Sequence, residues 1–189
     1  METILVKDLM VPVAEYATVP QTANLFDVVL ALEDSHTAID PSRHKHRAVL
    51  VLDEQKQVVG KLSMIAILKA LEPKYGKLEA KGTLSRSGHS PDLIESIFQS
   101  YFLWNETLDL VCSRAPNIKV RDLIGLPEES GYIEETDDLA KSIHKLVVAE
   151  YASLLVKRGD HVVGILRLSD VFLKICKRIK SCGDGLEKN

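Results

Sequence analysis

The sequence predicts an α+β fold made of two copies of one supersecondary unit, with a helical segment inserted between them. The first observation is an apolar strand pattern, broken by one glycine, that leads directly into a helix at residues 162–170. The second is that residues 58–66 repeat this order, with Gly60 and Gly164 standing 104 positions apart (164 − 60). An internal repeat of this length indicates two units that bury their apolar faces against each other.

The repeat extends well beyond these glycines. It runs without a gap through the preceding strand, where Leu50 matches Leu154 at the same spacing. Farther upstream Asp8 matches Asp122 at a spacing longer by ten residues. The first copy therefore carries ten extra residues, which fall within residues 35–45.

Composition narrows the classes of protein that this chain can represent. Its 189 residues are 46% hydrophobic and 27% charged, which is typical of a globular protein. The net charge of −3 argues against general affinity for nucleic acid. Three cysteines without metal-ligand or disulfide spacing indicate reduced thiols, and no apolar run approaches the roughly 20 residues of a membrane span. We therefore expect a cytoplasmic protein that does not enter a membrane.

The elements of the first copy follow from its hydrophobic periodicity and its helix-start residues. A short strand is expected at residues 16–19, and a helix follows with Thr22 as its N-terminal cap. Residues 48–53 and 58–62 predict an antiparallel hairpin, because two apolar runs flank a polar turn. A second helix should start at Ser63 and end close to Pro73.

The inserted segment combines a polar connector with an aromatic helix. Residues 77–90 read as the connector, and Ser90 then starts a helix with Pro91 in its first turn. Apolar residues recur on one face of this helix and just beyond it: Ile94, Ile97, Phe98, Tyr101, Phe102 and Trp104. Such a stripe must be buried, either on the two copies or at a subunit interface, and the sequence leaves both options open.

The second copy repeats the order of the first. We expect a strand at residues 131–134, a helix from Thr136, and a hairpin of residues 153–157 and 161–166. A terminal helix follows. The resulting division of the chain is residues 1–72 for the first unit, 73–118 for the insert, 119–181 for the second unit and 182–189 for a frayed tail.

Both units resemble the CBS motif, which is named after cystathionine β-synthase. Residues 6–10 (Val-Lys-Asp-Leu-Met) and 120–124 (Val-Arg-Asp-Leu-Ile) match its lead-in. Residues 164–170 match its Gly-apolar-apolar-Ser/Thr-x-x-Asp ending, although Arg167 stands at the Ser/Thr position. The resemblance implies a tandem pair of β-α-β-β-α motifs related by a pseudo-twofold axis, with two clefts for adenosine-containing ligands.

The resemblance also implies which residues would bind the ligand. In this family the Asp bonds the ribose hydroxyls, the Ser/Thr position faces phosphate, and the other copy lines the adenine. The better cleft would contain Asp170, Ser169, Arg167, Ile165, Pro12, Ala17, His46, Arg47 and Ala48. The other cleft would contain Lys61, Ser63, Ile65, Ala66, Leu126, Gly131, Glu150, Tyr151 and Ala152. It lacks the ribose acceptor, because Ala66 replaces the Asp, and it places Glu150 close to any phosphate.

No nucleophile-base pair, metal cluster or phosphate loop is recognisable, so we expect neither an enzyme nor a metal site. The resemblance implies a regulatory module that binds AMP, ADP or ATP, forms a homodimer and signals to an unidentified protein. Two alternatives stay open. One is a nucleotide-blind protein-interaction or oligomerisation module that uses the aromatic helix, and the other is a nucleic-acid binder that uses the basic residues before Ala48.

Overall fold

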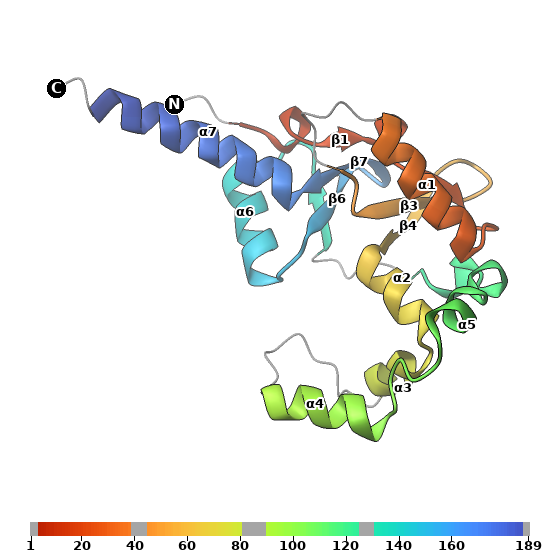
Figure 1. Cartoon of the computed structure of the whole chain (residues 1–189). Coiled ribbons are helices and arrows are strands. Elements are labelled where there is room, and N and C mark those ends of the chain that lie inside the picture. Colours follow the sequence, from red (N-terminus) through yellow and green to blue (C-terminus); the bar gives the residue numbers. More distant parts are fainter. Residues whose placement is uncertain (1–3, 39–44, 81–89, 125–130, 187–189) are drawn as a thin grey trace.

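The structure, a computed structural model, describes residues 4–38, 45–80, 90–124 and 131–186. Two sheets, flanked by helices, form the body of the molecule (Figure 1). The first sheet has the order β2 (Thr18–Pro20), β3 (Ala48–Leu52) and β4 (Val58–Ser63). The second has the order β1 (Val11–Pro12), β7 (His161–Arg167), β6 (Ser153–Arg158) and β5 (Tyr132–Glu134). This arrangement confirms the α+β fold class.

Each sheet contains the same three-stranded unit. A short strand pairs in parallel with the next strand of its copy, which then forms an antiparallel hairpin with the third. The helices of the two copies are α1 (Leu25–Ala38), α2 (Met64–Leu71), α6 (Leu139–Val148) and α7 (Leu168–Leu186). Short 3-10 helices are η1 (Val6–Asp8), η2 (Val13–Glu15), η3 (Ala115–Asn117) and η4 (Val120–Asp122). The predicted repeat is therefore a structural repeat.

Each lead-in packs on the other copy, which the sequence did not predict. Val6 is fully buried in the apolar core of the second copy, and its backbone N–H donates to Asp137 at 2.9 Å. Val120 is likewise buried in the core of the first copy, and its N–H donates to Ala23 at 3.0 Å. This exchange of lead-ins ties the two copies together at both ends of the pair.

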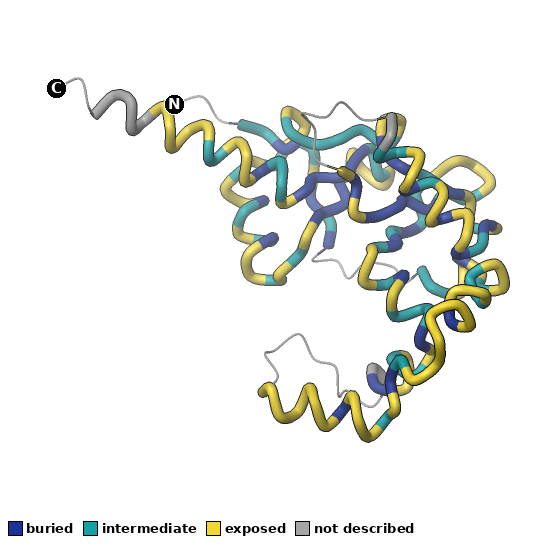
Figure 2. The backbone as a smooth tube through the Cα atoms, viewed as in Figure 1, coloured by how far each residue is buried: buried dark blue, intermediate teal, exposed yellow. Residues whose placement is uncertain are grey.

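A third apolar cluster joins the two sheets. Its buried members come from both copies and are Tyr16, Leu50, Leu155 and Ile165. Figure 2 shows buried backbone concentrated along the strands where the sheets meet. The burial of apolar surface between the copies is the main favourable contribution to their association.

The first helix of each copy starts later than predicted. The capping residue is Asn24 rather than Thr22, because the side chain of Asn24 accepts from Asp27 N–H at 3.1 Å. In the second copy Asp138 accepts from Lys141 N–H at 2.8 Å, at the position equivalent to Asn24. Asn and Asp cap helices better than Thr, because their side-chain oxygens reach the orphan N–H groups more readily. Thr22 was therefore wrong as a cap, and Thr136 was wrong as the start of its helix.

Strand β1 explains the glycine of the second repeat. It pairs antiparallel with β7, with Val11 opposite Ile165 and Pro12 opposite Gly164. A Cβ atom on Gly164 would lie 2.7 Å from the backbone oxygen of Val11, which is too close for any side chain. Glycine is therefore required where β1 crosses β7.

The extra residues of the first copy partly extend its helix. Helix α1 continues to Ala38, one turn beyond the position that matches the end of α6. The loop expected after it falls at residues 39–44, outside the described residues. At the other end of the chain α7 continues to Leu186, past the predicted start of a frayed tail at residue 182.

The insert contains α3 (Lys74–Ala80), α4 (Pro91–Ser100) and α5 (Leu108–Cys112). The predicted helix start is confirmed, because Ser90 caps α4 by accepting from Leu93 N–H at 3.3 Å. The predicted polar connector was wrong at its beginning, since residues 77–80 are helical and Leu78 is fully buried. Helix α4 stands away from both sheets (Figure 1).

The insert has a small core of its own. Ile97 packs with Leu78 and Leu103, and the partly buried rings of this core are Tyr75, Tyr101 and Trp104. The option that the aromatic stripe packs on the two copies was therefore wrong. Other members of the stripe stay largely exposed, with Ile94 at 57%, Phe98 at 49% and Phe102 at 68%.

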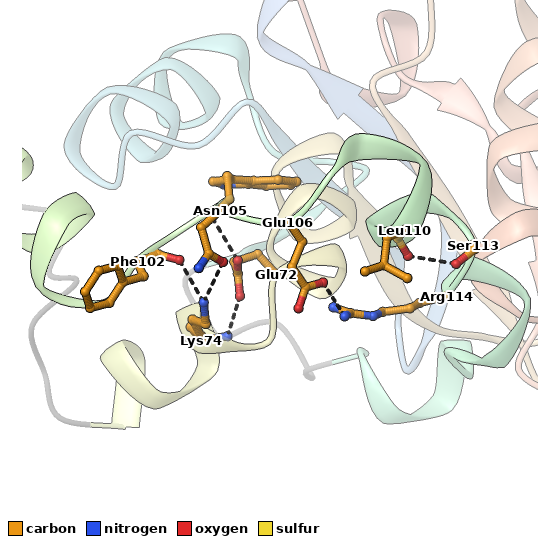
Figure 3. Close-up of polar contacts among 9 residues, drawn as sticks. Glu72, Lys74, Phe102, Asn105, Glu106, Leu110, Ser113 and Arg114 are labelled. Carbon is orange, nitrogen blue, oxygen red and sulfur yellow. Dashed lines mark hydrogen bonds and ion pairs between the residues drawn. The ribbon is translucent and has the colours of Figure 1, made fainter.

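Polar contacts join the start of the insert to the segment that follows α4 (Figure 3). The buried Glu72 carboxylate accepts from the backbone N–H groups of Lys74 at 3.3 Å and Trp104 at 2.9 Å. The Lys74 ammonium donates to the backbone oxygen of Phe102 at 2.7 Å. These contacts hold Phe102 and Trp104 at positive φ angles of 47° and 55°, which residues other than glycine adopt at a cost.

Candidate ligand-binding cleft

A cleft of about 1250 Å³ lies between the two copies. Its walls are the segments that enter β3 and β6, the ends of β4 and β7, and the starts of α2 and α7. Five cations line it, namely Lys45, Arg47, Lys61, Lys69 and Arg167, against the two carboxylates of Asp122 and Glu150. The cleft is thus positively charged in a chain whose net charge is −3, and such a site favours an anionic ligand.

Lys61 crosses the cleft from one copy to the other. Its ammonium donates to the backbone oxygen of Ser153 at 2.9 Å and to the Ser153 hydroxyl at 3.0 Å. Lys61 lies on β4 of the first copy, and Ser153 begins β6 of the second. A cation in the middle of a strand with apolar neighbours was a sequence signal that this position faces a polar site.

Arg167 and Asp170 form a bidentate ion pair at the end of β7. Arg167 Nε donates to Asp170 Oδ2 at 2.5 Å, and a terminal nitrogen donates to Oδ1 at 2.8 Å. The pair is well shielded, since the side chains are only 10% and 16% exposed. Arg167 lines the cleft, whereas Asp170 is not among the lining residues.

Tyr16 and His46 form a stacked pair beside Arg167. The ring centroids are 3.9 Å apart with an interplanar angle of 17°. Burial raises the pKa of Tyr16 to about 12, opposed by the charge of Arg167 and by a backbone hydrogen bond at Arg47. Tyr16 therefore stays neutral at physiological pH. It is a lining residue that the sequence reasoning missed, because an aromatic residue just before a strand is not distinctive in sequence.

His46 is a packing residue in this arrangement. Its Nδ1 accepts from the backbone N–H of Ala17 at 3.2 Å, and its side chain is almost fully buried. Burial, followed by the charges of Arg167 and His36, lowers its pKa to about 4. A buried neutral ring that already accepts a hydrogen bond is poorly suited to contact phosphate, so the role predicted for His46 does not agree with its position.

The remaining residues of the predicted better cleft divide into two groups. Arg47, Ala48 and Ser169 line the cleft together with Arg167. Ile165 and Ala17 are buried in apolar clusters, and Pro12 belongs to β1. The structure thus brings only part of the predicted set to the surface of one cavity.

The residues predicted for the other cleft meet at this same cavity. Those that line it are Lys61, Ser63, Ile65, Ala66, Gly131, Glu150, Tyr151 and Ala152, while Leu126 lies outside the described residues. The side chain of Ser63 also caps α2, since it accepts from Ala66 N–H at 3.2 Å. Parts of the two predicted clefts therefore form one continuous cavity.

Other functional classes were searched for within the described ranges. No group of three or more His, Cys, Asp or Glu residues there is placed to hold a metal ion. In the same ranges, no helix is both long enough and apolar enough to span a bilayer.

The exchanged lead-ins, the repeated β-α-β-β-α units and the cleft at their junction define a tandem pair of like modules. Residues 6–73 match the model of the CBS domain family. Solved structures of CBS-domain proteins share the fold over nearly the whole chain. Residues 6–73 are therefore identified as a CBS domain, and the chain as a whole has the fold of tandem CBS-pair proteins.

Three solved structures illustrate the likeness. CBSX2 from Arabidopsis thaliana is 16% identical, with coverage of 95% of this chain and 99% of its own and a TM-score of 0.59. A structure of CBSX2 in complex with AMP is 18% identical, with 94% and 98% coverage and a TM-score of 0.58. The CBS domain of the bacterial CNNM/CorC family Mg²⁺ transporter in complex with ATP is 14% identical, with 92% and 87% coverage and a TM-score of 0.57. A search of curated protein sequences found no match.

Proposed function

We propose that this chain is a regulatory module that binds an adenine nucleotide between its two CBS motifs and signals to a partner protein. The observation that carries the proposal is the cleft itself, which is positively charged, is shared by both copies and has a volume of about 1250 Å³. Ligand sites for small molecules commonly reach about 1000 Å³. A nucleotide bound there would contact both copies at once, which gives it a means of altering their relative position.

The class of ligand is supported by the related structures. CBSX2 has been solved with AMP, and the CBS domain of the Mg²⁺ transporter has been solved with ATP. In this chain the phosphates would meet Arg47, Lys61 and Arg167, which line the cleft from both copies. Planar guanidinium groups suit phosphate oxygens, because they donate two parallel hydrogen bonds.

Isothermal titration calorimetry with AMP, ADP, ATP, adenosine and S-adenosylmethionine tests this proposal. We expect the three phosphorylated nucleotides to bind more tightly than adenosine or S-adenosylmethionine, because the cleft presents cations to an anionic group. Equal or reversed preference would contradict the assignment of the cleft to nucleotide phosphates.

A second function is favoured by the exposed apolar residues of the insert. Ile94, Phe98 and Phe102 extend from a segment that has its own core and stands apart from the sheets (Figure 2). The chain would then serve as an oligomerisation or protein-interaction module, with or without a nucleotide. Flat titrations against every nucleotide, together with stable self-association, would favour this function over nucleotide sensing.

Self-association also belongs to the main proposal. We propose a cytoplasmic homodimer, and the exposed apolar side chains of Ile94, Phe98 and Phe102 on the insert support the self-association. The protein that receives the signal would be recognised through a different surface.

A further inference from the structure

The ion pair of Arg167 and Asp170 alters how the cleft would recognise a nucleotide. Both carboxylate oxygens of Asp170 accept hydrogen bonds from the Arg167 guanidinium, at 2.5 and 2.8 Å. The first copy cannot form this pair, because Ser63 and Ala66 occupy the equivalent positions. The carboxylate at the ribose position of the second motif is therefore already engaged within its own motif.

The two members of the pair face the ligand differently. Arg167 lines the cleft, whereas Asp170, in the first turn of α7, is not among the lining residues. The arginine also stands close enough to Tyr16 and His46 for its charge to influence both rings. A ligand in the cleft would therefore lie against Arg167, which already holds the carboxylate of Asp170.

We infer that Arg167 is a specificity residue that makes recognition of ribose by Asp170 depend on a phosphate group in the same ligand. This inference rests on the proposed nucleotide function and deepens it. When a phosphorylated nucleotide binds, the guanidinium exchanges its carboxylate partner for phosphate oxygens, and Asp170 becomes available to the ribose hydroxyls. Without a phosphorylated ligand, the ion pair keeps Asp170 bound to Arg167.

The physical reason is the cost of breaking a shielded bidentate ion pair without an equivalent replacement. A nucleoside without phosphate must separate Arg167 from Asp170 and offers the guanidinium nothing in return. A nucleotide offers phosphate oxygens, whose geometry suits a guanidinium as well as a carboxylate does. Phosphate and ribose are therefore recognised together, and adenosine binds much more weakly than AMP.

The substitution Arg167→Ser tests the inference, because it restores a hydroxyl residue at this position and releases Asp170. Calorimetry should show weaker AMP binding and tighter adenosine binding than in the unmodified chain. We expect the preference for AMP over adenosine to fall by at least about tenfold, which corresponds to the loss of one charged hydrogen-bonding interaction.

Arg158→Ser is the matched control. Arg158 forms the same kind of bidentate pair with Glu135, at 2.5 and 2.8 Å, but it is exposed and lies outside the cleft lining. Its replacement should leave the preference for AMP unchanged. Circular dichroism verifies that each variant is folded, and Arg167→Lys, which keeps the charge but loses the planar fork, replaces Arg167→Ser if that variant does not fold.

The outcomes are distinguishable. If the unmodified chain binds AMP and the Arg167 variant keeps the same preference, or if adenosine binding does not improve, the inference is wrong while the proposed function stands. If the unmodified chain binds no nucleotide at all, the proposed function is wrong, and the inference that rests on it is wrong as well.

Discussion

The ammonium of Lys61 in the first copy donates to both the backbone oxygen and the hydroxyl of Ser153 in the second copy, at 2.9 and 3.0 Å. This relationship links strand β4 to strand β6 across the inter-copy cleft. It also places a positive charge in the cleft wall, where a phosphate would bind. The same side chain therefore serves the packing of the pair and the charge of the candidate site.

Lys61→Met should weaken nucleotide binding, because it removes a cation from the cleft while it retains an unbranched side chain. We expect the affinity for ATP to fall at least about tenfold, since hydrogen bonds to charged groups contribute roughly 1.5–3 kcal/mol. Calorimetry at two salt concentrations should also show a weaker salt dependence. Lys174→Met, an exposed position on α7, makes the same change in net charge and should leave binding unaffected. Equal affinities in the two variants would exclude a role for Lys61 in phosphate binding.

Binding should saturate at about one nucleotide per chain. Only the second copy has a carboxylate at the ribose position, because Asp170 is matched by Ala66 in the first. Glu150 further opposes phosphate on that side of the cleft, which it lines. The stoichiometry in calorimetric titrations checks this prediction, and Ala66→Asp should raise the stoichiometry only weakly while Glu150 is present. Two equal sites in the unmodified chain would be incompatible with this asymmetry.

The stability of the protein should decrease as the pH falls from about 6.5 to 4. The folded-state pKa of His46 is about 4, below its ordinary value of 6.5, so the unfolded chain binds more protons in this interval. The stabilisation from the neutral ring is complete above pH 6.5 and is lost as the pH approaches 4, by roughly 3 kcal/mol at most. Urea unfolding of His46→Asn, whose amide oxygen can replace Nδ1 as acceptor, should depend less on pH in this range.

His144→Asn provides the control for the pH experiment, because His144 is exposed on α6. Carboxylates that titrate near pH 4 are common to both variants, so the difference between the two pH profiles isolates His46. Parallel profiles for His46→Asn and the unmodified chain would show that the ring titrates normally in the folded protein.

Glu72→Ala should loosen the insert while the two copies stay folded. The substitution leaves the backbone N–H groups of Lys74 and Trp104 without their acceptor, at an expected local cost of about 1–3 kcal/mol. Trp104 is the only tryptophan, so a red shift of its fluorescence reports the change directly. Glu106→Ala removes a half-exposed pair with Arg114, which is worth only about 0–1 kcal/mol, and should leave the emission unchanged. Identical spectra for Glu72→Ala and the unmodified chain would refute the role of this carboxylate.

Sedimentation should show a dimer at micromolar concentration. The apolar side chains of Phe98 and Phe102 are 49% and 68% exposed in the single chain, and their burial between two copies would be favourable. Replacement of both by Asp should yield monomers, whereas Ser96→Asp, at an exposed position of the same helix, should not. A monomer at all concentrations, with or without nucleotide, would contradict the proposed homodimer.

Local residue patterns predicted the strands and helices well where only near neighbours decide the conformation. The hairpins were confirmed, including the tight turn at which Gly159 adopts a φ of +61°. The starts of α1 and α6 were misplaced by a few residues, because Thr22 and Thr136 were chosen although Asn24 and Asp138 are the stronger capping residues. Helix α3 was missed because Leu78 gains its burial from Ile97 and Leu103, which are distant in sequence.

The sequence by itself determined the internal repeat, the α+β class, the polar turns and the residue types that reach the cleft. These properties depend on periodicity and on the chemistry of single residues. Only the tertiary structure decided that each lead-in packs on the opposite copy, that His46 is buried against Tyr16, and that Asp170 is engaged by Arg167. Each of these contacts depends on the direction in which a side chain points and on what lies across the interface, and no spacing along the chain specifies either.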